Sequence, residues 1–215
     1  MPITINGTGS ISGLSSGGLP DGSITAADLA SSLNLTGKTV TLPSGTGGKI
    51  LQVKTTLYDT PTSISTVNDG HKELPFYVDI TPTSATSRFI VSYQTGGELS
   101  ANDHWNQLAA LGRANDSGSG FGSISWFYPA SPGARNRGLG ILSISYNATD
   151  NSSTPEEFGV SNYVDDPDTT DTLRYYPGLW TNSAYTWYVN RCLTDNNDDG
   201  YERFRSWISV MEVAD

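Results

Sequence analysis

From Lys49 onward, apolar and polar residues alternate with a period of two along much of the chain. This period is typical of β-strands with one buried face, because successive side chains of a strand point to opposite sides of the sheet. It predicts at least seven strands, whose apolar members are Leu51, Val53 and Leu57; Phe76, Val78 and Ile80; Phe89, Val91 and Tyr93; Ile124, Trp126 and Tyr128; Leu142, Ile144 and Tyr146; Tyr185, Trp187 and Val189; and Trp207, Met211 and Val213.

Turn-rich spacers separate these strands at Asn68-Asp69-Gly70, Thr95-Gly96-Gly97 and residues 151–155, and the glycine-rich run at 118–122 is predicted to turn a corner between strands. No long amphipathic helix lies between them. Many short strands joined by polar turns favour an all-β fold, an antiparallel β-sandwich that is jelly-roll-like, over residues 49–215.

Residues 100–112 give conflicting signals. Ser100 and Asp103 form a capping-box pattern, and Trp105, Leu108 and Leu111 follow at helical spacing with Gly112 as a stop. Helix and strand are therefore both open for this segment.

Two further parts precede the sandwich. Residues 1–20 are rich in Gly, Ser and Thr, and such a segment cannot bury enough apolar area to offset its ordering entropy, which predicts a flexible tail. In residues 21–48, Thr25 and Asp28 form a capping box at the start of a short helix. A helix of about ten residues is marginal on its own in water, so we expect it to pack against copies of itself in a stem. The expected stem contacts are Ile24, Leu29 and Leu33.

Charge and cysteine content narrow the classes of partner. The 12 Lys and Arg against 22 Asp and Glu give a net charge of −10, which argues against binding to nucleic acid or to anionic lipid. The one cysteine, Cys192, excludes an internal disulfide. No basic n-region with an apolar h-region follows Met1, and no run of 18 apolar residues occurs, so neither secretion nor membrane insertion is expected.

Motifs for catalysis or cofactor binding are weak. Gly37-Lys38-Thr39 resembles the end of a phosphate-binding loop, but Ser32 stands where the loop needs glycine. His71 and His104 lack the spacing of a zinc site or a triad. Asp195, Asn197 and Asp199 occupy positions one, three and five of a calcium loop, yet position twelve is Ser206, and a solvated hairpin loop is the alternative. No cofactor is predicted.

Aromatic residues point to binding. Five Trp and eleven Tyr supply amphipathic rings that stack on the apolar faces of sugars, although many of them must fill the core. Around Pro177-Gly178, which the sequence suggests is a turn, Tyr175, Tyr176 and Trp180 are the expected exposed contacts. Arg135 and Arg137 could contact a carboxylated sugar or pair with acids across a subunit boundary.

Several phrases resemble trimeric bacteriophage virion fibres, in particular those of marine and cyanobacterial phages. They are Gly-Ser-Ile-Thr-Ala-Ala-Asp-Leu (22–29) with Thr-Gly-Lys-Thr-Val-Thr-Leu-Pro (36–43), Tyr-Val-Asp-Asp-Pro (163–167), Tyr-Val-Asn-Arg (188–191), Thr-Asp-Asn-Asn-Asp-Asp-Gly (194–200) and Ser-Trp-Ile-Ser-Val-Met-Glu-Val-Ala (206–214). The resemblance implies a homotrimer in the virion, a tail fibre or head fibre, whose N-terminal tail docks on other virion proteins and whose C-terminal knob points outward. It brings no catalytic residue.

Three functions stay open on this basis. The first is a structural appendage that adheres to a host surface glycan or receptor, and the second is a capsid decoration protein without a ligand. The third is a glycan depolymerase, which needs two carboxylic groups flanking a sugar. Neighbouring acids such as Glu156 with Glu157, or Asp165 with Asp166, would point to opposite faces of a strand, so the sequence indicates a protein that is not an enzyme.

Overall fold

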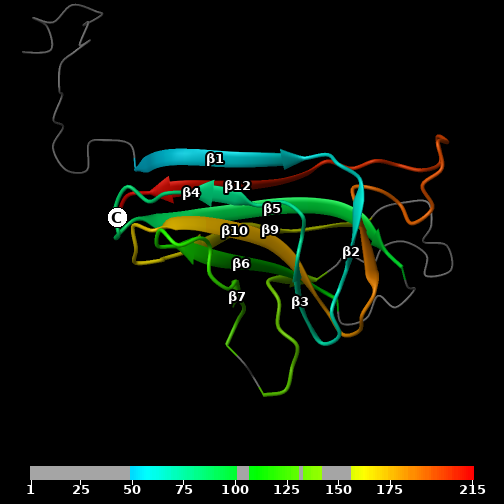
Figure 1. Ribbon diagram of the computed structural model, residues 1–215, viewed down its shortest axis with the longest axis horizontal. Coiled ribbons are helices and arrows are strands. Elements are labelled where there is room, and N and C mark those ends of the chain that lie inside the picture. Colours follow the sequence, from blue (N-terminus) through cyan, green and yellow to red (C-terminus); the bar gives the residue numbers. More distant parts are fainter. Residues whose placement is uncertain (1–48, 101–106, 131–132, 142–155) are drawn as a thin grey trace, which may run out of the picture. The chain divides into compact units, whose positions relative to one another are not determined.

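The computed structural model describes residues 49–100, 107–130, 133–141 and 156–215. Within these ranges the regular secondary structure consists of β-strands, with no helix (Figure 1). Residues Gly48–Asp215 form one unit. No membrane-spanning helix occurs in the described ranges. The predicted all-β class is confirmed for this part of the chain.

Sheet A contains six antiparallel strands. They are β1 (Ile50–Tyr58), β2 (Thr62–Ser65), β5 (Arg88–Leu99), β9 (Glu156–Asp165), β11 (Thr186–Val189) and β12 (Ser206–Val213). Their order is β1-β12-β5-β11-β2, and β9 also pairs with β5. In Figure 1, β1 lies beside β12, so the first and last described strands are neighbours at one edge of the sheet.

Sheet B also contains six antiparallel strands. They are β3 (Gly70–Glu73), β4 (Val78–Ile80), β6 (Leu108–Asp116), β7 (Ser125–Phe127), β8 (Gly140–Ile141) and β10 (Thr172–Thr181). The order is β3-β10-β6-β7, with β4 beside β10 and β8 beside β6. The chain passes repeatedly from one sheet to the other, and the two sheets form the antiparallel, jelly-roll-like sandwich that the alternation predicts.

The core lies between the inner faces of the two sheets. Large side chains from both sheets are fully buried there, among them Phe89 and Trp187 of sheet A and Leu173 and Leu179 of sheet B. Tyr93 of β5 crosses the gap, and its hydroxyl donates to the carbonyls of Ala110 at 2.8 Å and Gly178 at 3.2 Å. Apolar burial supplies the main driving force, and the Tyr93 hydrogen bonds tie β5 to β6 and β10.

A second link between the sheets is ionic. The Arg113 guanidinium of β6 donates to the Asp165 carboxylate of β9 at 2.5 Å, and the Tyr175 hydroxyl of β10 donates to the same oxygen at 2.8 Å. Burial, and then the neighbouring Asp165 carboxylate, raise the pKa of the Tyr175 hydroxyl, which therefore stays a donor. Three strands are joined through one buried carboxylate.

Six of the seven predicted strands are present within the described residues, but their inner faces were only partly predicted. The apolar members of β4, β5 and β11 point into the core as expected. In β1, β7 and β12 the alternating apolar set instead points outward. Leu57 of β1 is 62% exposed, while Glu212 of β12 is buried. Phe127, Ile208 and Val210 supply the inward side chains of β7 and β12.

The buried Glu212 carboxylate is stabilised because both of its oxygens accept hydrogen bonds. It accepts hydrogen bonds from the amide and hydroxyl of Thr83, at 2.7 and 2.6 Å, and from the Gln52 amide at 2.6 Å. Burial works to raise the pKa of the Glu212 carboxyl, but these donors outweigh it and the pKa is lowered. The carboxylate thus remains ionised within the fold.

Two predicted turns are strands in the structure. Thr95-Gly96-Gly97 lies inside β5, and Pro177-Gly178 lies inside β10, so both turn predictions are wrong. The Pro177 carbonyl accepts a hydrogen bond from the Leu74 amide, in the gap between β3 and β4. In an antiparallel strand the nitrogen and the carbonyl of one residue point to the same side, so the Pro177 nitrogen also faces this gap. No backbone N–H is needed there for strand pairing, so proline is tolerated. Gly97 of β5 is required by close contacts described in the Discussion.

Other sequence predictions have mixed outcomes. Asn68-Asp69 does turn the chain between β2 and β3, and 118–122 joins β6 to β7, as predicted. Residues 108–112 are strand, so the helical interpretation is wrong for them. The sequence did not reveal β2, β3, β9 or β10. The tail at 1–20, the stem at 21–48 with Ile24, Leu29 and Leu33, the strand at 142–146 and the spacer at 151–155 lie outside the described residues.

Candidate functional site

The outer face of sheet B carries a band of aromatic side chains. The strand register places Trp126 of β7 opposite Gly112 of β6, and Gly112 opposite Tyr176 of β10. Gly112 and Gly178 are needed here because a Cβ on either would approach the Trp126 ring to 2.9 and 2.5 Å. The tryptophan ring thus lies over two glycines and reaches from β7 towards β10.

One half of the band is built around Trp126. The His71 ring of β3 stacks on the Trp126 ring, with ring centroids 5.1 Å apart. The Tyr128 ring also stacks on His71, with ring centroids 5.9 Å apart. The Arg137 guanidinium lies over the Tyr128 ring at 4.0 Å. Burial lowers the pKa of His71, and the Arg137 charge lowers it further, so His71 is neutral at neutral pH and contributes an apolar ring face.

The other half is built around Arg174 of β10. Its guanidinium binds the Asp79 carboxylate of β4 through two hydrogen bonds of 2.7 and 2.8 Å. It also lies over the rings of Tyr77 at 3.6 Å and Phe121 at 4.0 Å. Tyr77 and Tyr176 are 5.8 Å apart. The hydrogen bonds to Asp79 fix Arg174, which in turn holds two aromatic rings on the surface.

We name this surface the aromatic band. It comprises His71, Tyr77, Phe121, Trp126, Tyr128 and Tyr176, with Arg137 and Arg174. Tyr77 and Tyr128 are 41% and 44% exposed, and the other rings are half-buried. The rings therefore have accessible faces but fixed positions, which suits the stacking of a flat ligand with an apolar side.

The five sequence-predicted contact residues are only partly brought together. Tyr176 and Arg137 lie in the aromatic band. Tyr175 and Trp180 are 0% and 6% exposed, so the prediction that they are surface residues is wrong. Arg135 is exposed in the connection between β7 and β8. Sequence reasoning missed Tyr77, Phe121 and Trp126 as surface residues, because the alternation of Ile124, Trp126 and Tyr128 shows a strand but not which of its sides faces outward.

Comparison with known proteins gives no family. No family model and no curated protein matches the chain. Solved structures of infectious bursal disease virus are similar: the Gx strain at 12% identity and TM-score 0.35, the VP2 subviral particle at 13% and 0.30, and the Gt strain at 13% and 0.34. They cover 76%, 87% and 87% of this chain, which spans 40%, 50% and 45% of theirs. At these TM-scores the likeness carries no functional argument.

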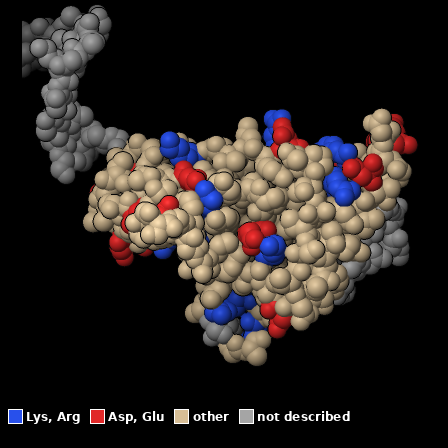
Figure 2. Space-filling view, viewed as in Figure 1, with Lys and Arg blue, Asp and Glu red and all other residues tan. Residues whose placement is uncertain are grey.

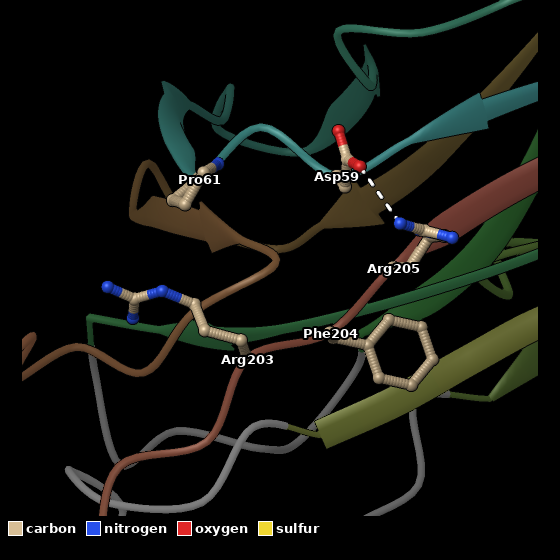
Figure 3. Close-up of a pocket in the computed structure, with 5 residues that line it drawn as sticks. All are labelled: Asp59, Pro61, Arg203, Phe204 and Arg205. Atoms are coloured by element: carbon tan, nitrogen blue, oxygen red, sulfur yellow. Dashed lines mark hydrogen bonds and ion pairs between the residues drawn. The ribbon is translucent and has the colours of Figure 1, made fainter. Parts of the chain in front are cut away.

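A hollow of about 520 Å³ lies at the connection between β1 and β2 (Figure 3). Arg203, Phe204 and Arg205 line it opposite Asp59 and Pro61. The Arg205 guanidinium reaches the Asp59 carboxylate at 3.1 Å, and Arg203 pairs with Asp195 outside the hollow. Both cations are already paired with acids, so the hollow is a weaker candidate for an acidic ligand than its arginines suggest.

The acidic loop is held by arginines. Asp195 pairs with Arg203 and, at 3.8 Å, with Arg191. Asp198 accepts from the Gly200 amide at 3.2 Å. In the described part of the chain no three metal-ligating side chains converge to hold an ion. Asp195, the first residue of the predicted calcium loop, is thus paired with arginine side chains.

Two buried carboxyl groups lie on neighbouring strands near the end of β5. Glu98 of β5 and Glu156 of β9 are both buried, and the Leu193 amide donates to Glu98 at 2.5 Å. Burial, and then the Glu98 charge, raise the pKa of Glu156 to about 7. The sequence could not predict this pair. Because both side chains are buried, the pair does not have the open, sugar-flanking arrangement that glycan hydrolysis needs.

The pair predicts a pH effect on stability. The folded pKa of Glu156 exceeds the ordinary value of 4.5, so its stabilising contribution is complete below about pH 4.5 and is lost as the pH rises through 7. Raising the pH from 5 to 8.5 should lower the free energy of unfolding of the wild type by roughly 2 kcal/mol more than that of the Glu156→Gln variant. Denaturant unfolding of both proteins at the two pH values measures the difference. Equal pH dependence of the two would contradict the raised pKa.

Proposed function

We propose that this chain is a structural virion protein, a trimeric bacteriophage appendage of the tail-fibre or head-fibre kind, whose knob binds a host surface glycan. In this proposal residues 1–20 attach to the particle, residues 21–48 form the stem, and the aromatic band is the binding surface. The stem and C-terminal phrases support the class of appendage, and the exposed, fixed rings of the aromatic band support the ligand.

The chemistry of the aromatic band favours a sugar whose ring has an apolar face and few charges. Its two arginines are engaged, Arg174 with Asp79 and Arg137 over Tyr128, and His71 is neutral. Figure 2 shows acidic and basic side chains in small mixed groups on the visible face, with uncharged surface between them. Within the aromatic band the Arg174 charge is paired with the Asp79 carboxylate, which weakens the field that would select a polyanion. Three copies acting together would multiply a modest single-site affinity.

Truncating the exposed rings tests the glycan proposal. We expect Tyr77→Ala and Tyr128→Ala each to weaken binding of the full chain to host envelope polysaccharide by about tenfold, and the double variant to abolish it. Both rings are over 40% exposed, so the fold should be retained. Surface plasmon resonance measures the affinity, and circular dichroism checks folding.

The matched control is Tyr201→Ala, in the loop between β11 and β12 of sheet A, which should bind like the wild type. Binding that is unchanged in the double variant would show that the ligand contacts another surface. Absence of any glycan binding by the wild type, measured with an oligosaccharide array and whole host cells, would leave decoration of the particle as the function. Density for the chain on the particle, sought by cryo-electron microscopy, tests the virion assignment itself.

A further inference from the structure

The outer face of sheet A carries a second surface that the glycan proposal does not use. Through the register of four adjacent strands, Val53 of β1 lies opposite Met211 of β12, Met211 opposite Ile90 of β5, and Ile90 opposite Val164 of β9. Four apolar side chains thus lie abreast across the sheet. Val53 and Val164, at its two ends, are each 51% exposed.

Further apolar side chains flank this row on the same face. Leu57 is opposite Trp207, and Ile50 is opposite Val213. Leu57 and Ile50 are 62% and 58% exposed, and Trp207 is fixed by its ring N–H, which donates to the Gln94 side chain at 3.0 Å. We name this surface the apolar face, comprising Ile50, Val53, Leu57, Ile90, Val164, Trp207, Met211 and Val213. A contiguous exposed patch of this kind is typical of an interaction surface.

The centre of the apolar face is uncharged, although the chain has a net charge of −10. Between its rows lie Thr55, Ser209 and Ser92, and the Thr55 hydroxyl donates to that of Ser209 at 2.9 Å. The charged groups on this face lie towards its ends: Arg88, which pairs with Asp166 at 3.2 Å, Glu157, and Asp59, which pairs with Arg205 at 3.1 Å beyond Leu57 and Trp207. Two acidic chains can therefore approach each other here without like charges meeting.

The surface also has relief and an open edge. Beside Trp207, a hollow of about 280 Å³ is lined by residues including Gln94, Glu157 and Gly159. β1 ends the strand order of sheet A, so within the described residues its outer edge has no strand partner. A hollow next to protruding leucine and valine side chains, and an unpaired nine-residue edge strand, are both features that a partner would cover.

We propose that the apolar face is the surface through which copies of this chain associate. The occupant is a second copy because the chain enters the sandwich at Ile50, at the end of β1 on this same face. A stem at 21–48 that joins three chains would bring three β1 strands close together around one axis. That the apolar face binds another copy of this chain rests on the proposed trimer. The inference goes further by naming the surface of the knob through which the copies contact one another.

The test uses charge substitutions in the full chain. Val53→Glu and Leu57→Glu place a carboxylate on the apolar face at positions that are more than half exposed, and Val164→Glu does the same on β9. The control, Val67→Glu, changes a valine that is 40% exposed in the turn after β2, off this face. Sedimentation velocity over a dilution series gives the dissociation midpoint, and circular dichroism confirms that each variant is folded.

We expect a wild-type trimer whose dissociation midpoint rises by at least about tenfold in the Val53→Glu, Leu57→Glu and Val164→Glu variants and not in Val67→Glu. A wild-type trimer with the same midpoint in all variants would overturn the inference while leaving the proposed trimeric appendage intact. A monomeric wild type would overturn both the inference and the proposed trimer. The occupant of the apolar face would then be residues 1–48 of the same chain or a different virion protein, and this alternative occupant would not rescue the inference.

Discussion

Gly97→Ala should destabilise the knob by about 3 kcal/mol or more, the largest effect we expect from adding a single methyl group. Gly97 lies in β5 between β9 and β11, paired with Glu156 and Val189. A Cβ there would overlap the backbone carbonyl of Tyr188 and come within 2.8 Å of the Trp187 ring. Neither neighbour can move, because one is backbone and the other is fully buried.

The measurement for Gly97→Ala is thermal unfolding followed by circular dichroism, with a fall in Tm of roughly 10 °C. Gly122→Ala is the matched control, since its Cβ would have one neighbour within 4 Å, the Asn115 carbonyl at 3.8 Å. It should unfold within about 0.5 kcal/mol of the wild type. A Gly97→Ala protein that melts like the wild type would contradict the close packing of β5 against β11.

Asp165→Ala should lower the free energy of unfolding by about 3–5 kcal/mol. The substitution leaves the Arg113 guanidinium without its carboxylate partner and removes the acceptor of the Tyr175 hydroxyl. The Asp165 side chain is 9% exposed and that of Arg113 is 18% exposed. Water therefore compensates the remaining cation poorly. Chemical denaturation gives the free energy of unfolding, provided that the transition is two-state.

Two comparisons separate this effect from ordinary charge removal. Asp59→Asn breaks the exposed pair with Arg205, whose side chains are 67% and 62% exposed, and should cost less than about 1 kcal/mol. Adding Arg113→Met to Asp165→Ala should recover part of the loss, because the uncompensated charge is then gone. A double variant that is no more stable than Asp165→Ala would mean that the Tyr175 hydrogen bond, and not the ion pair, carries the energy.

The alternation in the sequence was enough to predict where many strands lie, because period two depends on the pleat alone. It could not decide which side of a strand faces inward when both sides carry apolar residues. In β12, Trp207 and Met211 alternate with Ile208 and Val210, and only the second pair is in the core. The inverted choice in β1, β7 and β12 is what exposes the apolar face and much of the aromatic band.

Other features depended on contacts between distant residues. Pro177-Gly178 is a typical turn sequence, yet β10 tolerates the proline where β3 and β4 leave a gap and needs the glycine beneath Trp126. The Glu98 charge acts on Glu156 because β5 and β9 pair, although the two residues are far apart in the chain. Local patterns carry no information on such pairings, so the candidate surfaces emerged only in three dimensions.

The two surfaces fit one arrangement of the protein. The aromatic band lies on the outer side of sheet B and the apolar face on the outer side of sheet A, so they are on opposite sides of the sandwich. Copies that associate through sheet A would leave the aromatic band of each copy turned away from the shared surface. Each copy would then keep its aromatic band accessible to a ligand.

The structure of the full chain bound to an oligosaccharide released from the host envelope tests the central claim most directly. The account predicts a sugar ring stacked on the exposed rings of the aromatic band, in contact with Tyr77, Trp126 or Tyr128, in each copy. A sugar bound in the hollow beside Arg203 and Arg205, or on the outer face of sheet A, would contradict it.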